Sequence, residues 1–139
     1  DSSGLVRFKP VTNANYRGNH AIIFVYSIDD HESFNNIQIW NNKVNEHASE
    51  STIKILVGNK LDLKNNRRVD ANEAESFAKN NGFKYFIETS AKNNINIDKL
   101  FQEITKQIMI KKREYQTQIQ IDSAILHSNV NSCKCCNIL

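Results

Sequence analysis

The polar segment Asn59-Lys60-Leu61-Asp62 follows an apolar run and holds residue types suited to binding a purine base. The Asp62 carboxylate can accept two parallel hydrogen bonds from the N1–H and 2-amino groups of guanine, a donor pair that adenine lacks. Lys60 can lay its aliphatic stem along a base while its ammonium stays in water, and Asn59 can tie neighbouring loops together. The alternative is an ordinary polar junction between a strand and a loop.

A second polar segment, Ser90-Ala91-Lys92, follows another apolar run about 30 residues later, as one βαβ unit requires. The backbone N–H of Ala91 can donate to O6 of guanine, where adenine has an amino group. Together with Asp62, this contact would recognise both polar edges of guanine. Two such segments at this spacing favour a guanine site over two unrelated polar junctions.

The hydrophobic pattern predicts a parallel sheet that would place both segments at one edge. Apolar runs rich in β-branched and aromatic residues predict buried strands over 21–27, 53–58 and 83–89. Strands that alternate with helices form parallel sheets with right-handed crossovers. Ligands of such sheets bind at the carboxyl ends of the strands, which is where both polar segments begin.

Residues that favour helix ends bound the predicted helices. Asp29 and Asp70 are each followed three residues later by Glu, which predicts helix starts. Asn81-Gly82 predicts the end of the second helix, because Gly tolerates a left-handed backbone. Asn96 is the predicted cap of a last helix. The apolar stripe of this last helix consists of Ile97, Leu100, Phe101, Ile104 and Ile108.

Length and composition favour one globular domain. The chain has 139 residues, of which 40% are hydrophobic and 24% charged. No run approaches the roughly 20 apolar residues of a membrane span, and a net charge of +3 is too small to argue for nucleic-acid binding. The only Met is Met109, and the chain opens at Asp1 without a signal peptide. This opening predicts a fragment or a truncated gene model.

The last residues form a second candidate functional segment. After Arg113 the helical periodicity fails, and we expect a flexible tail over 113–139, with a strand of alternating Gln and Ile as the alternative. The three Cys all lie in this tail, which suits a reducing cytosol. Cys136-Asn137-Ile138-Leu139 fits a C-a-a-X motif for geranylgeranylation, and Cys135 adds a second acceptor. The alternative is a reactive or metal-binding Cys cluster, which a shortage of nearby His makes a poor zinc site.

These motifs resemble the Rab branch of the Ras superfamily. The stretches that carry the resemblance are Arg7-Phe8-Lys9-Pro10-Val11-Thr12, Asn15-Tyr16-Arg17-Gly18, Val25-Tyr26-Ser27-Ile28-Asp29 and Glu32-Ser33-Phe34 with Trp40, beside the two guanine segments. The resemblance implies an α/β, three-layer P-loop NTPase (Ras-like) fold, here incomplete. Residues 1–112 would be the C-terminal part of a small GTPase domain, and residues 113–139 its hypervariable tail.

Asp1-Ser2-Ser3-Gly4 is similar to the D-x-x-G element of this family. The resemblance implies that Asp1 holds Mg²⁺ through water and that the Gly4 amide senses the γ-phosphate of GTP. Leu5 stands where the family usually has the Gln that orients the attacking water, and Leu cannot form that hydrogen bond. One interpretation is that the sequence of this switch segment has diverged while its packing is kept. The other is that hydrolysis is slow or absent and the GTP-bound state is favoured. No catalytic residue is therefore intact in this sequence.

The printed sequence contains no G-x-x-x-x-G-K-[ST] phosphate loop and no switch Thr ahead of Asp1. Without these elements, the nucleoside guanosine offers about 20 heavy atoms for contact, which at about −0.3 kcal/mol each gives a dissociation constant of tens of micromolar at best. Two functions are left as hypotheses.

The first is a membrane-anchored GTP/GDP switch of vesicle traffic that cycles between the cytosol and the cytoplasmic face of an intracellular membrane. It would act with effectors, an exchange factor, and escort and prenylating proteins. The second is a lipidated interaction module without nucleotide turnover.

Overall fold

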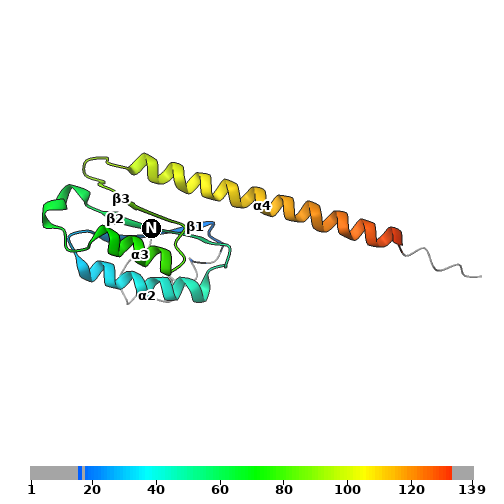
Figure 1. Ribbon diagram of the computed structural model, residues 1–139, viewed down its shortest axis with the longest axis horizontal. Helices are drawn as coiled ribbons and strands as arrows, with labels where there is room; N and C mark the ends of the chain where they lie inside the picture. Colours follow the sequence, from blue (N-terminus) through cyan, green and yellow to red (C-terminus); the bar gives the residue numbers. More distant parts are fainter. Residues whose placement is uncertain (1–15, 17, 133–139) are drawn as a thin grey trace, which may run out of the picture. The chain divides into compact units, whose positions relative to one another are not determined.

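The computed structural model describes Tyr16 and residues 18–132, with side chains through residue 122. Its elements follow in the order β1 (Ala21–Ser27), α2 (His31–His47), β2 (Ile53–Asn59), η2 (Leu61–Asn66), α3 (Ala71–Asn80), β3 (Tyr85–Glu88) and α4 (Ile97–Ser132). The strands form a parallel sheet in the order β1-β2-β3. Figure 1 shows α2 and α3 on one face of this sheet. The predicted α/β class and the parallel three-strand sheet are confirmed.

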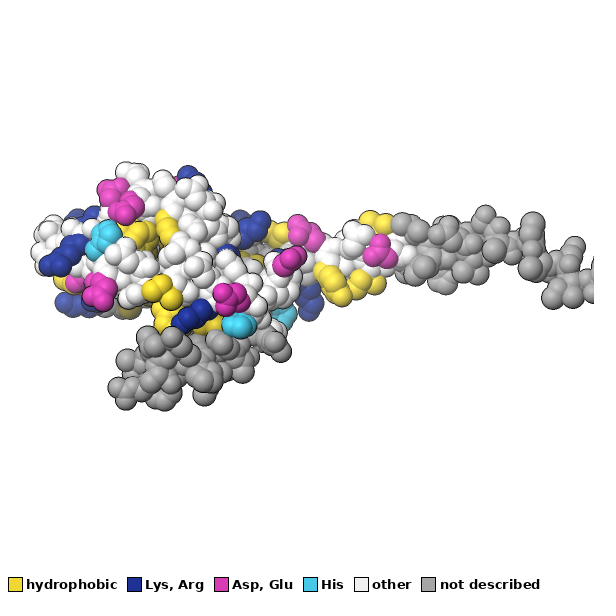
Figure 2. Space-filling view, turned by 90° about the horizontal axis from the view of Figure 1, so that it is seen from below, with side chains coloured by type: hydrophobic (Ala, Val, Ile, Leu, Met, Phe, Trp, Pro, Cys, Tyr) yellow, Lys and Arg dark blue, Asp and Glu magenta, His cyan; other side chains and the backbone are white. Residues whose placement is uncertain are grey.

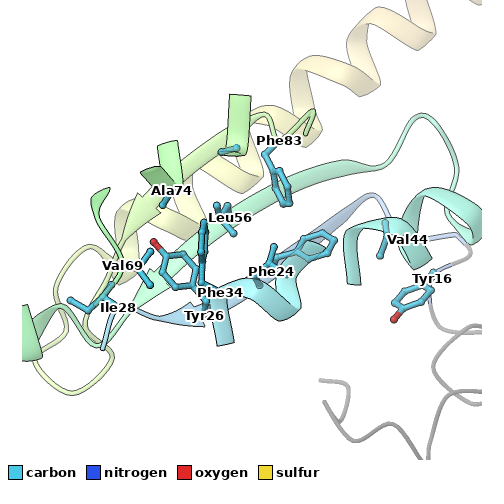
Figure 3. Packing of buried hydrophobic residues seen from close by; sticks show 12 residues of the cluster. Tyr16, Phe24, Tyr26, Ile28, Phe34, Val44, Leu56, Val69, Ala74 and Phe83 are labelled. Atoms are coloured by element: carbon cyan, nitrogen blue, oxygen red, sulfur yellow. The ribbon is translucent and has the colours of Figure 1, made fainter. Parts of the chain in front are cut away.

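Aromatic side chains fill the space between the sheet and the two helices. Phe24 and Tyr26 of β1 are buried on this face, and Tyr26 packs against Phe34 of α2 with ring centroids 4.9 Å apart. Phe34 in turn contacts Phe77 of α3 at 5.2 Å, and Phe24 contacts Phe83 at 5.1 Å. Figure 3 shows Phe24, Tyr26, Phe34 and Phe83 in the same cluster as Leu56 of β2. Burial of this apolar surface holds α2 and α3 against the sheet.

The helix starts agree with the sequence in one case and differ in another. Asp70 caps α3 as predicted, because its side chain accepts from the amides of Asn72 and Glu73. Asp30 rather than Asp29 caps α2, with its carboxylate accepting from the amides of Glu32 and Ser33. The predicted start of α2 at Asp29 was therefore wrong by one residue, and the Asp29 side chain is left to make other contacts.

The end of α3 confirms the predicted turn. Asn81 is its C-cap, and Gly82 follows with a φ of +74°, a backbone conformation that costs glycine little. Asn96 stands directly before α4, and its carbonyl accepts from the Leu100 amide at 3.0 Å. Its φ is +59°, and its side-chain amide donates to the Glu88 carbonyl at 2.8 Å. β3 is shorter than predicted because the amide of Phe83 bonds to Ala78 in the turn before the strand.

α4 extends well past the predicted helix end near Arg113, so that boundary was wrong, as was the alternative of a strand after it. Its residues after 113 are mostly good helix formers without Gly or Pro. Gln118 bonds to Asp122 one turn later at 2.9 Å, which adds local support. The chain divides into two compact units at Ile104. In the first unit, Leu100 and Ile104 are buried, whereas in the second Tyr115 is 68% exposed.

Acidic and basic side chains are interspersed on the side of the molecule where α2 lies. Figure 2 shows this side, with Lys, Arg, Asp and Glu distributed among polar side chains rather than separated by sign. Among the described residues, none of the helices is long and apolar enough to cross a membrane.

Candidate functional site

The strands β2 and β3 bring the two polar segments to the same edge of the sheet. Gly58 lies opposite Glu88 in the parallel register, and the amide of Thr89 extends the ladder by donating to the Gly58 carbonyl at 2.8 Å. Asn59 and Thr89 therefore leave the sheet side by side. The sequence prediction that the segments meet at the carboxyl ends of their strands agrees with this geometry.

Asn59 ties the two loops together. Its Oδ1 accepts from the backbone amide of Ala91 at 3.2 Å and from the hydroxyl of Thr89 at 3.3 Å. Beside it, the amide of Leu61 donates to the Thr89 carbonyl at 2.9 Å. Thr89 is 1% exposed, so its own bonds form away from competing water, whereas Ala91 is exposed. The loops after β2 and β3 are thus joined at their first residues.

Asp62 is oriented by Ser90. The Ser90 hydroxyl donates to Asp62 Oδ1 at 2.5 Å, and the same hydroxyl oxygen accepts from the amide of Asn93 at 3.2 Å. Ser90 is fully buried, while Asp62 is half-buried at the start of η2. An ionised carboxylate has about four acceptor positions. The bond from Ser90 therefore fixes the carboxylate and leaves it able to accept further hydrogen bonds from a ligand.

The Ala91 amide is already used inside the protein. Because it donates to Asn59, the predicted hydrogen bond to guanine O6 requires that this N–H be shared between two acceptors, as in three-centre bonds. The loop is otherwise held by Ser90 and Ile95, whose backbones exchange hydrogen bonds at 3.1 and 2.9 Å. Lys92, the last residue of the predicted segment, is exposed.

Lys60 is held at its backbone and at its tip. Its φ of +65° is in the left-handed region, which is uncommon for a residue with a side chain. Its ammonium lies 3.4 Å from Oδ1 of Asp29 at the end of β1. The same oxygen accepts a short hydrogen bond from the Ser27 hydroxyl. The pKa of Asp29 is below its usual value, chiefly because of the Ser27 hydrogen bond and less because of the Lys60 charge.

A second ion pair braces the same edge of the sheet. The Arg67 guanidinium contacts both carboxylate oxygens of Glu88, at 2.6 and 2.8 Å, and also donates to the Val69 carbonyl at 3.0 Å. Both side chains are largely buried, at 25% and 16% exposure. This pair links the segment between η2 and α3 to the last residue of β3, directly before the Thr89 loop.

Comparisons with known proteins identify the family. The Ras family model matches residues 1–110 of the chain. The GTP-binding protein YPTM1 of Zea mays is 42% identical over 120 residues, which are 86% of this chain and 57% of that protein. Ras-related protein Rab-13 of Bos taurus is 41% identical over 80% of this chain and 54% of its own length. Rab-1D of Dictyostelium discoideum is 39% identical over 92% and 62%. This chain belongs to the Rab family of small GTPases.

The Rab chain spans between 54% and 62% of the length of these relatives. Several predicted site residues lie outside the described part of the structure, namely Asp1, Gly4, Leu5, Cys135 and Cys136. Within the described part, no group of three or more His, Cys, Asp or Glu side chains could hold a metal ion. The described part of the candidate site therefore consists of the loops that follow β2 and β3.

Sequence reasoning missed the residues that support this site. Asp29 was assigned to a helix cap, and no role was predicted for Ser27, Arg67 or Glu88. One available signal was that Ser27 ends β1 and Asp29 follows it, at the same sheet edge as Lys60, where parallel strands end together. The Arg67–Glu88 pair gave no comparable signal, because the path of the chain after η2 decides which strand end Arg67 meets.

Proposed function

We propose that this Rab chain provides the guanine-recognising part of a switch that alternates between GTP and GDP. The observation that supports it is the joined pair of loops after β2 and β3, in which Ser90 orients the Asp62 carboxylate and Asn59 bonds to the Ala91 amide. A fixed carboxylate in a half-buried position discriminates strongly between bases, because a wrong base would leave its remaining acceptor positions without donors.

Each residue has a separate role in this proposal. Asp62 accepts from the N1–H and 2-amino groups of guanine, the Ala91 amide contacts O6, and the Lys60 stem lies against the base. Asn59 and Ser90 hold these groups in place, and Lys92 completes the second loop. By family resemblance, Asp1 and Gly4 would contact Mg²⁺ and the γ-phosphate, and the metal ion would supply positive charge to the phosphates.

The wider function follows from the family. Residues 1–112 would act as the C-terminal part of a GTPase domain, and residues 113–139 as the hypervariable tail. Geranylgeranyl groups on Cys135 and Cys136 would anchor the protein to the cytoplasmic face of an intracellular membrane, since two lipid chains give stable attachment. There the protein would act in vesicle traffic with Rab effectors, an exchange factor, and escort and prenylating proteins, and would cycle with the cytosol.

An alternative function is a lipidated interaction module that binds partners without nucleotide. Two features of the sequence favour it: Leu5 at the usual Gln position and a printed sequence without a phosphate loop. Submicromolar GTP binding by the purified chain would exclude this alternative.

Titration of the purified chain with guanosine tests the proposal through the amide signals of Leu61, Ala91 and Asn93 in NMR spectra. Guanosine should bind with a dissociation constant of tens of micromolar at best, and adenosine should cause no saturable shifts. Equal shifts with both nucleosides would reject base recognition at this site.

The variant Asp62→Asn gives a sharper test. It replaces one acceptor by a donor, which should remove guanosine binding and permit binding of xanthosine, whose C2 carbonyl can accept from the new amide. Asp122→Asn makes the same chemical change on an exposed part of α4 and should leave the preference for guanosine unchanged. Retained guanosine binding in Asp62→Asn would show that this carboxylate does not recognise the base.

A further inference from the structure

Asp29 contacts the proposed guanine site from the loop that follows a third strand, β1. It lies just beyond the end of β1, and its Oδ1 is 3.4 Å from the Lys60 ammonium although the two residues are 31 apart in the sequence. The Asp29 side chain is 25% exposed and that of Lys60 51% exposed. The contact is therefore partly shielded and lies at the edge where the base-facing loops begin.

The position of Asp29 is itself fixed by its neighbours. The Ser27 hydroxyl donates to the same Oδ1, and Ser27 is anchored through its amide, which donates to Ser33 Oγ at 3.0 Å. The Asp29 side chain does not cap α2, because Asp30 is the N-cap residue of that helix. The hydrogen bond from Ser27 lowers the pKa of Asp29, so the carboxylate stays ionised at neutral pH.

The Lys60 backbone is equally constrained. The residue adopts a left-handed conformation between Asn59 and η2. Its carbonyl accepts from the Leu63 amide at 2.8 Å, and the next amide, that of Leu61, bonds to Thr89 across the sheet edge. A lysine stem that is fixed at its base and attracted at its tip has few remaining rotamers.

We propose that Asp29 is a positioning residue for base recognition, which draws the Lys60 ammonium toward β1 and thereby extends the lysine stem into a preformed apolar surface for guanine. This inference rests on the proposed guanine-binding function. It assigns the positive charge of Lys60 to Asp29, so that Lys60 serves the base through its methylene groups. Preorganisation of this kind improves affinity because less side-chain entropy is lost on binding.

A double-mutant cycle with guanosine as the probe tests this role in the full chain. Asp29→Asn should weaken guanosine binding about two- to fivefold, the range expected for a partly exposed ion pair. In a Lys60→Met background, which keeps the stem and removes the ammonium, the same substitution should change the affinity less than about 1.5-fold. Asp30→Asn is the matched control, because it removes the neighbouring charge while Asn still caps α2.

The outcomes separate a positioning role from a structural one. An equal loss in both backgrounds would mean that Asp29 acts through the fold and not through Lys60, and would overturn the proposal. Unchanged affinity in Asp29→Asn would overturn it as well.

A measurement without ligand distinguishes failure of the positioning role of Asp29 from failure of the proposed guanine recognition. The pKa of Asp29, followed by NMR, should rise in Lys60→Met and rise more in Ser27→Ala. If this pKa did not change in Lys60→Met, the ion pair and the inference would be rejected whatever guanosine does. The pKa of Asp29 could instead rise in Lys60→Met while the wild-type chain bound no guanosine at millimolar concentration. Guanine recognition would then be rejected, and the positioning role of Asp29 would be rejected with it.

Discussion

The Tyr26 hydroxyl is a buried polar group in an aromatic core. The Tyr26 residue is 2% exposed, and its hydroxyl forms no hydrogen bond with the described residues. Burial, with a smaller contribution from Glu88, raises the pKa of Tyr26 well above its usual value. The hydroxyl lies over Gly58, where an added Cβ would approach it to 2.7 Å. Gly58 therefore makes room for a group that costs free energy to bury.

Two substitutions at this contact have opposite expected effects. Tyr26→Phe should raise the free energy of unfolding by about 1 kcal/mol, because it removes an unpaired buried hydroxyl. Gly58→Ala should lower it by about 1–3 kcal/mol through overpacking, and by less in the Tyr26→Phe background. Urea unfolding measures all of these values, with Tyr85→Phe at a half-buried position of β3 as the control. A clear loss of stability in Tyr26→Phe would show that the hydroxyl has a partner.

At the scale of elements, the Arg67–Glu88 pair joins the connection before α3 to the end of β3. Arg67→Met should lower the free energy of unfolding by about 2 kcal/mol, because it leaves the largely buried Glu88 carboxylate without its two charged hydrogen bonds. The exposed pair Glu75–Lys79 on α3 is the control, and Lys79→Met should cost less than about 0.5 kcal/mol. Equal effects of the two substitutions in thermal or urea unfolding would contradict a special role for Arg67.

Lys54 connects three elements and makes their stability depend on pH. Its ammonium, on β2, donates to Asn41 and Asn45 of α2 at 2.8 and 3.0 Å and to the carbonyl of Asn81 after α3 at 2.9 Å. Burial lowers the pKa of Lys54. Between this lowered pKa and the usual value of the unfolded chain, the unfolded state binds more protons, so stability rises with pH.

We expect the stability of the wild-type chain relative to Lys54→Met to increase as the pH rises through the alkaline range towards about 10.5, the usual pKa of lysine. Urea unfolding at several pH values measures this difference. The same subtraction with Lys79→Met, whose lysine is exposed, provides the control. A difference that stays constant over this range would show that the folded and unfolded states hold the Lys54 proton equally.

The sequence predicted those elements whose boundaries depend on local patterns. The strand 21–27 was predicted at its observed bounds, and the turn at Asn81-Gly82 was found because the required backbone conformation favours Gly. The helix after Arg113 was missed, because its mixture of Gln, Thr and Ile lacks a clear apolar stripe although its residues form helices well.

The site could be predicted only in part, because some of its contacts depend on tertiary structure and not on local patterns. Asn59 and Ala91 were placed together because each follows a strand of the same parallel sheet. The contacts of Asp29 with Lys60 and of Arg67 with Glu88 depend on side-chain direction and on the register between strands. Neither is encoded in a local pattern of residue types.

At the scale of the whole molecule, β1 is the sheet element with the most exposed apolar surface. In the described structure it pairs only with β2, and on the face away from α2 its Ile23 is 37% and its Val25 56% exposed. An open apolar edge of this kind promotes association between chains. We therefore expect residues 1–139 expressed alone to associate through this strand as the protein concentration rises.

Val25→Lys should increase the soluble, monomeric fraction of the chain, because a charge on an edge strand opposes pairing with a second strand. Light scattering after size-exclusion chromatography measures that fraction. Ile39→Lys, at a 52% exposed apolar position on α2, is the control and should have little effect. An unmodified chain that stays monomeric at every concentration measured would contradict the expectation.

The bonds between the loops after β2 and β3 would also couple the proposed base recognition to folding. Asn59 and Ala91 are 32 residues apart in the sequence, and Asp62 and Ser90 are 28 apart. Neither loop can acquire its bonded form from its own segment of chain, because β3 must first align beside β2. A base that binds only the bonded loops would therefore stabilise the pairing of β3 with β2. The tighter the base binds, the more free energy is needed to detach β3 from the sheet.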